Sequence, residues 1–174
     1  MKYQDCRQAL QAGEAAIEAV DAQRLRAANI NPATGLASDY LNHFHEAIML
    51  LEMLPSEPDC RDDFLQWRAK SYAEHFAGSH FKDRELAIAA YDAADVLARE
   101  CLDTLAKIMT LMLETTRSAL ARRDMSPTEA AALAEDVAAW LRPLVIRAGA
   151  AINGDTETVE LAAPQAIADA LMRQ

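Results

Sequence analysis

The chain has 174 residues, of which 52% are hydrophobic and 25% charged, with five glycines and six prolines. These proportions are typical of a single globular domain, spanning 1–174, that is large enough to fold without a disulfide or a structural metal. The 27 acidic and 17 basic residues give a formal charge of −10, which repels phosphate backbones and anionic lipid, so we expect neither nucleic-acid nor membrane binding.

The cysteines indicate a reducing compartment. Cys6, Cys60 and Cys101 form no C-x-x-C pair, and the first residues lack the apolar run of a secretory signal. The longest apolar stretch, 47–51, is far shorter than the roughly 20 residues that cross a bilayer. We therefore expect a cytoplasmic protein.

Arg61 could lower the pKa of the neighbouring Cys60 thiol, but no partner motif for a nucleophile accompanies it.

The first half of the chain predicts short amphipathic helices. Residues 3–28 place apolar side chains three and four apart, which predicts a first helix. Loop-forming residues fill 31–35, and the oxygen of Ser38 or Asp39 can cap a second helix at about 39–54.

A third helical segment follows a proline-containing loop. Pro55 ends the second helix, and the loop leads into a helix over about 62–77. We expect that helix to be interrupted near Lys70 and Ser71 and to end at Gly78.

A single long helix is predicted at about 84–122, where neither glycine nor proline occurs and one apolar stripe continues throughout. Some 39 residues would extend about 58 Å, whereas a compact globule of this length is about 40 Å across. Either the helix breaks, with Asp95 capping its restart, or the molecule is elongated and buries the surplus surface against a second copy. We expect a homodimer.

The last third begins with a strong helix start. In Ser126-Pro127-Thr128-Glu129 the serine and the glutamate can form a capping box. The helix should kink at Pro143 and end before the turn at 153–154. Weak β character follows over 156–163, and a final helix is expected at 164–172. The predicted fold is all-α, a bundle of about five or six helices.

The residues able to carry chemistry are concentrated between positions 40 and 91. All four histidines and eight of the ten aromatic residues lie there. Such groups give a ligand pocket much of its shape and proton chemistry, although the same concentration is expected of the thickest part of a core. The candidate pocket residues are Tyr40, His43, His45, Trp67, Tyr72, His75 and His80.

The helix at 39–54 supplies the sharpest hypothesis. Asp39, His43 and Glu46 share one helical face, and one imidazole with two carboxylates could hold a transition metal if His75 or His80 completed the set. The spacing matches neither H-E-x-x-H nor the repeated Glu-x-x-His of di-iron bundles. A metal-free acid/base or ligand pocket and a structural polar network therefore stay open as alternatives.

The sequence contains no complete catalytic motif. It has no glycine-rich phosphate loop, no G-x-S-x-G elbow and no dinucleotide fingerprint. The favoured hypothesis is an acidic, dimeric, cytoplasmic helical protein that acts by binding a protein partner or a small ligand. The alternative is a metal-dependent or acid/base enzyme that uses His43 and Glu46 with Asp39, His75 or His80.

Overall fold

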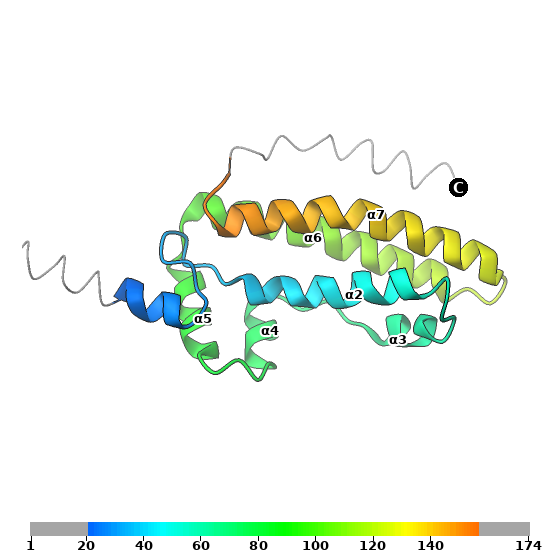
Figure 1. The fold of residues 1–174 in the computed structure, drawn as a ribbon, viewed down its shortest axis with the longest axis horizontal. Coiled ribbons are helices and arrows are strands. Elements are labelled where there is room, and N and C mark those ends of the chain that lie inside the picture. The colour runs from blue at the N-terminus through cyan, green and yellow to red at the C-terminus, as the bar shows by residue number, and fades with distance from the viewer. Residues whose placement is uncertain (1–20, 157–174) are drawn as a thin grey trace, which may run out of the picture.

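Helices joined by loops and turns make up the residues described by a computed structural model, 21–156, and this part of the chain contains no strand (Figure 1). This confirms the predicted all-α bundle. Residues 21–27 are also helical. The named elements are η1 (Ser38–Leu41), α2 (Asn42–Met53), α3 (Cys60–Gln66), α4 (Tyr72–Ala77), α5 (Arg84–Asp92), α6 (Val96–Leu120) and α7 (Pro127–Ile152).

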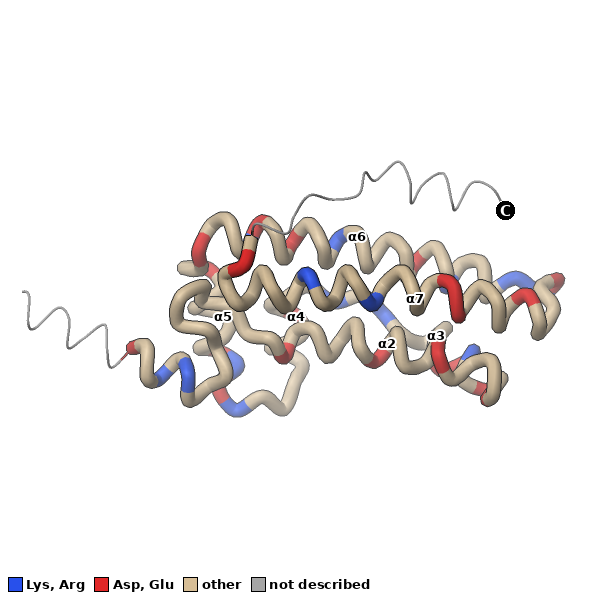
Figure 2. Tube along the Cα trace, turned by 45° about the horizontal axis from the view of Figure 1, so that its top comes forward, with Lys and Arg blue, Asp and Glu red and all other residues tan. Residues whose placement is uncertain are grey.

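Helices α6 and α7 form the long hairpin on which the other helices pack. They lie side by side and antiparallel, with α2 along them, α3 at one end, and α4 and α5 at the other (Figure 1). None of the described helices combines the length and the apolar character that a bilayer crossing requires. Acidic and basic residues are scattered over the described part of the chain (Figure 2).

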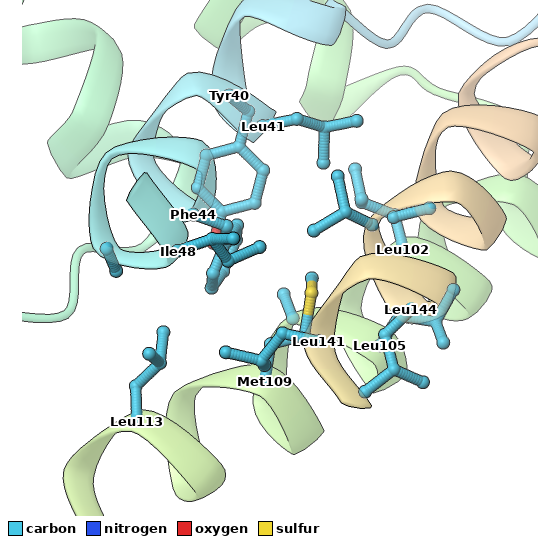
Figure 3. Close-up of a cluster of buried hydrophobic side chains, with 14 of the residues drawn as sticks. Tyr40, Leu41, Phe44, Ile48, Leu102, Leu105, Met109, Leu113, Leu141 and Leu144 are labelled. Atoms are coloured by element: carbon cyan, nitrogen blue, oxygen red, sulfur yellow. The ribbon is translucent and has the colours of Figure 1, made fainter. Parts of the chain in front are cut away.

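The core lies where α2 faces this hairpin. Phe44 and Ile48 of α2 point towards Leu105 and Met109 of α6 and Leu141 of α7 (Figure 3). All five side chains are buried, and each contributes about 1.5–3 kcal/mol of hydrophobic stabilisation. Met109 is therefore a core residue of the predicted apolar stripe.

The strongest helix start in the sequence is confirmed. The Ser126 hydroxyl accepts from the Glu129 amide at 3.3 Å, and the Glu129 carboxylate accepts from the Ser126 amide at 2.8 Å. Helix α7 then continues through Pro143 as one element and ends at the predicted turn, where Gly154 adopts a φ of +88°.

The single helix predicted at about 84–122 is wrong. The chain leaves the helical conformation between Ala93 and Asp95, where the Asp95 amide donates to the Thr34 carbonyl at 2.9 Å. The Asp95 carboxylate also accepts from the Ala98 amide at 2.9 Å, so α6 begins with the predicted cap. The 25 residues of α6 extend about 37 Å, so helix length no longer argues for a dimer.

The predicted cap of the second helix is also wrong. That helix begins as the 3-10 turn η1 with Ala37 at the N-cap position, and neither Ser38 nor Asp39 caps it. The predicted interruption near 70–71 is confirmed, because residues 67–71 are non-helical and separate α3 from α4.

The non-helical residues 67–71 and 93–95 divide two segments that could each have been one helix, so the described part has more helical elements than predicted. Residues 3–20 of the first predicted helix, almost all of the 156–163 segment and the helix at 164–172 lie outside the described residues.

Candidate ligand-binding groove

His43 is buried against Trp67 and bonded to the backbone of Lys70. Its side chain is 3% exposed, and its ring stacks on the indole with centroids 4.7 Å apart. Nε2 accepts a hydrogen bond from the Lys70 amide at 3.0 Å, while the Trp67 indole donates to the His43 carbonyl at 3.2 Å. These bonds attach α2 to the non-helical segment 67–71.

The same burial keeps the imidazole uncharged. Desolvation, together with the nearby charges of Lys70 and His75, lowers the pKa of His43 to about 4. Burial and Lys70 also lower the pKa of His75, whose ring lies 6.1 Å from that of His43 and 5.8 Å from that of Tyr40. Both imidazoles are thus neutral at pH 7.

The structure brings together only part of the predicted pocket. Tyr40, His43, Trp67, Tyr72 and His75 are joined by aromatic contacts. In contrast, His45 on α2 and His80 before α5 are exposed. His80 lies at a separate, polar depression that also includes Arg24 and Lys82.

The predicted metal set is not assembled. Among the described residues, no three His, Cys, Asp or Glu side chains are grouped so that they could share an ion. His43 faces Trp67 and already accepts a hydrogen bond at Nε2, while Glu46 and His80 are exposed and Asp39 is half-buried. The arrangement of Asp39, His43, Glu46, His75 and His80 therefore gives the metal hypothesis no support.

Beside the histidine cluster runs a groove of about 610 Å³ between α6 and the chain at 69–74. Tyr40, Tyr72 and Tyr91 lie along it, and the rings of Tyr72 and Tyr91 stack at 4.4 Å. The remaining lining residues are Ala69, Lys70, Ser71, Glu74, Asp103, Ala106, Lys107, Thr110, Leu111 and Glu114.

The three tyrosine hydroxyls are already hydrogen-bonded within the protein. Tyr40 donates to the Lys70 carbonyl at 3.1 Å and Tyr91 to the Asp103 carboxylate at 2.6 Å, while the Tyr72 oxygen accepts from the Ala37 amide at 2.9 Å. Burial raises the pKa of Tyr40 and of Tyr72 to about 12. The groove is therefore lined by neutral aromatic rings whose polar ends are occupied.

Sequence reasoning identified two groove residues, Tyr40 and Tyr72, and missed the contribution of α6. Asp103, Lys107 and Thr110 follow one another at helical spacing on one face of α6. That spacing was visible in the sequence, but a mixed polar face is the ordinary pattern of a solvent-exposed surface.

Cys60 does not have the environment of a nucleophile. Burial and the acidic residues Glu57, Asp63 and Asp59 raise the pKa of its thiol. The Arg61 guanidinium, expected to act in the opposite direction, donates to the Leu120 carbonyl.

Comparisons of the chain with protein-family models, with curated proteins and with solved structures gave no match. The assignment of function therefore depends on the geometry described above.

Proposed function

We propose that the protein is a non-catalytic binding protein that takes a small organic molecule into the groove between α6 and residues 69–74. The observation that carries this proposal is the set of three tyrosine rings, Tyr40, Tyr72 and Tyr91, in a groove of about 610 Å³. Ligand sites typically have about 300–1,000 Å³ and combine an apolar lining with a few polar groups.

The shape of the groove suits an elongated ligand with an apolar body. From Asp103 to Glu114, α6 advances eleven residues, or about 16 Å along the groove. Ala106 and Leu111 add aliphatic surface along this length, and Leu111 is 69% exposed. A ligand that covered these side chains and the tyrosine rings would remove apolar surface from water.

The polar groups of the groove support binding rather than catalysis. Neither His43 nor His75 is among the residues that line it, and the Asp103 and Glu74 carboxylates accept hydrogen bonds from Tyr91 and Ser71. The Ser71 hydroxyl does donate to the Glu74 carboxylate, but this pair is the capping box that starts α4, and the described residues that line the groove include no imidazole that could act as a general base. Cytoplasmic location and homodimer formation stay predictions.

The test is a fragment-binding experiment on the full chain, read by amide chemical shifts in two-dimensional NMR. Small aromatic and aliphatic fragments should shift amides at 69–74 and along the groove side of α6. Thr110→Trp, which fills the groove, should abolish these shifts. Thr104→Trp is the matched control, because Thr104 is an exposed threonine of the same helix that does not line the groove.

Binding that maps elsewhere contradicts the proposal. So does binding that persists at full strength in Thr110→Trp. Urea unfolding of both tryptophan variants shows whether each remains folded, so that lost binding is not confused with lost structure.

A further inference from the structure

We infer that one face of the α6–α7 hairpin is a docking surface for the protein's own C-terminal segment, residues 157–174. This surface, the hairpin face, consists of Leu97 and Ile108 of α6 and Leu133 and Trp140 of α7. It is separate from the ligand groove, which lies on another side of α6.

The α7 part of the hairpin face is turned away from α2. Leu133 and Trp140 are seven residues apart, so they lie on the same side of the helix. Arg142 follows Trp140 by two residues and therefore lies on the opposite side, where it pairs with Glu52 of α2.

The α6 part of the hairpin face is turned away from the groove. Leu97 and Ile108 are eleven residues apart, which is close to three full turns, so they share one side of α6. Thr110 of the groove, two residues after Ile108, lies on the opposite side. Cys101 and Met112, each four residues after a member of the face, are buried, so the face borders the packed side of α6.

These two sides adjoin, because α6 and α7 lie side by side (Figure 1). Within residues 21–156 no helix covers the hairpin face, since Leu97 is 65% exposed and Ile108, Leu133 and Trp140 are only half-buried. Aliphatic side chains around a half-buried tryptophan are typical of a contact surface.

The end of α7 places the following residues beside this face. The Thr34 hydroxyl donates to the Ile152 carbonyl at 2.7 Å, and the Thr34 carbonyl accepts from the Asp95 amide at 2.9 Å, so α7 ends next to the start of α6. Trp140 lies about 18 Å back along α7. Residues 157–163 can span up to about 24 Å, so the helix predicted after them can reach Trp140.

The sequence of the segment has an apolar side that needs a surface. In the helix predicted at 164–172, Ile167 and Leu171 share one side and Asp169 lies on the other. A helix this short is marginal in water, because isolated helices need about 12–15 residues. Packing its apolar side on the hairpin face would remove apolar surface of both from water.

Residues 1–20 also place apolar side chains three and four apart, but they suit the face less well. They precede the helix at 21–27, which lies beside α5, beyond the end of the hairpin (Figure 1). Residues 157–174 instead continue directly from α7.

Tryptophan fluorescence of the full chain tests the contact. Trp140 belongs to the hairpin face, whereas the only other tryptophan, Trp67, is 6% exposed. Leu171→Gln should increase the quenching of Trp140 by acrylamide and shift its emission to longer wavelength. Leu97→Gln should do the same, and the double variant should add little, because each change disrupts the same contact.

Amide chemical shifts in two-dimensional NMR locate the change. Among residues 21–156, the differences between wild type and Leu171→Gln should lie around Leu97, Ile108 and Trp140. The groove segment 69–74 should keep its shifts.

Two matched variants are the controls. Ile17→Gln makes the same kind of change in the segment 1–20. Ile146→Gln does so at a side chain that is 72% exposed and, six residues after Trp140, points about 120° away from the face. Both should leave the quenching of Trp140 unchanged.

Three results would overturn the inference. The first is unchanged quenching in Leu171→Gln, and the second is a rise in Ile17→Gln instead, which assigns the face to residues 1–20. The third is wild-type quenching that falls as protein concentration increases, which assigns the face to a second copy. Leu171→Ala, a smaller change, should act in the same direction as Leu171→Gln, and it decides the matter if circular dichroism shows that the glutamine variant is unfolded.

Discussion

Mild acid should destabilise the protein through His43. The ring is 3% exposed and its Nε2 accepts from the Lys70 amide, which only a neutral imidazole can do. Its pKa falls from the usual 6.5 to about 4 because of burial and the charges of Lys70 and His75. Between these values the unfolded chain binds a proton that the folded chain does not, so stability rises with pH.

The expected loss follows from the two pKa values. Between pH 7 and pH 5, linkage predicts that the free energy of unfolding falls by about 2 kcal/mol through His43 alone. The pKa of His75 is lowered too, so His75 acts in the same direction. Glu74 does not interfere, because the hydrogen bonds from Ser71 lower its pKa below 4.5 and its contribution is lost only in stronger acid.

Urea unfolding followed by circular dichroism at pH 5, 6 and 7 measures this loss. His43→Gln can keep the hydrogen bond from Lys70 through its amide oxygen but does not titrate, so it should lose most of the pH dependence. His45→Gln, at an exposed neighbouring position, should behave like the wild type. A wild-type stability that is flat from pH 5 to pH 7, or an unchanged slope in His43→Gln, would refute the reasoning.

Four further predictions concern the helix break, a loop, helix α7 and the oligomeric state. Asp95→Ala removes the acceptor for the Ala98 amide and should cost about 1 kcal/mol in urea unfolding. Gly35→Ala should cost more than about 1 kcal/mol, because φ is +74° and the new Cβ would lie 2.8 Å from the Ala90 carbonyl oxygen. Gly149→Ala, with no neighbour nearer than 3.7 Å, should instead stabilise α7 by up to about 1 kcal/mol. Light scattering at micromolar concentration should give twice the 19.1 kDa of one chain, and a monomer mass contradicts the homodimer.

Sequence signals were sufficient to predict those features whose contacts join residues only a few positions apart. The capping box at Ser126 needs only residues 126–129, and it was predicted and confirmed. The break before α6 was different, because the sequence permitted either a continuous helix or a restart at Asp95. The contact from the Asp95 amide to Thr34, about sixty residues away along the chain, accompanies the restart, and no local pattern contains that contact.

The candidate groove also depends on contacts between residues that are far apart in the sequence. The concentration of aromatic residues at 40–91 correctly indicated a packed cluster, since Tyr40, Trp67 and Tyr72 are buried. What the sequence did not show is that α6 supplies the opposite wall. The face with Asp103 and Lys107 has the composition of a solvent-exposed surface, and only the packing of α6 beside residues 69–74 makes it part of a groove.

The histidine cluster and the groove are joined through one residue, Lys70. Its amide donates to His43, and its carbonyl accepts from Tyr40, so both backbone polar groups of this non-helical residue are fixed by side chains of η1 and α2. Its side chain lines the groove. A wall held in this way loses little conformational freedom when a ligand binds, which reduces the entropic cost of binding. His43, a residue of the enzyme hypothesis, thus has a structural role, because together with Tyr40 it holds the wall on which the proposed ligand rests.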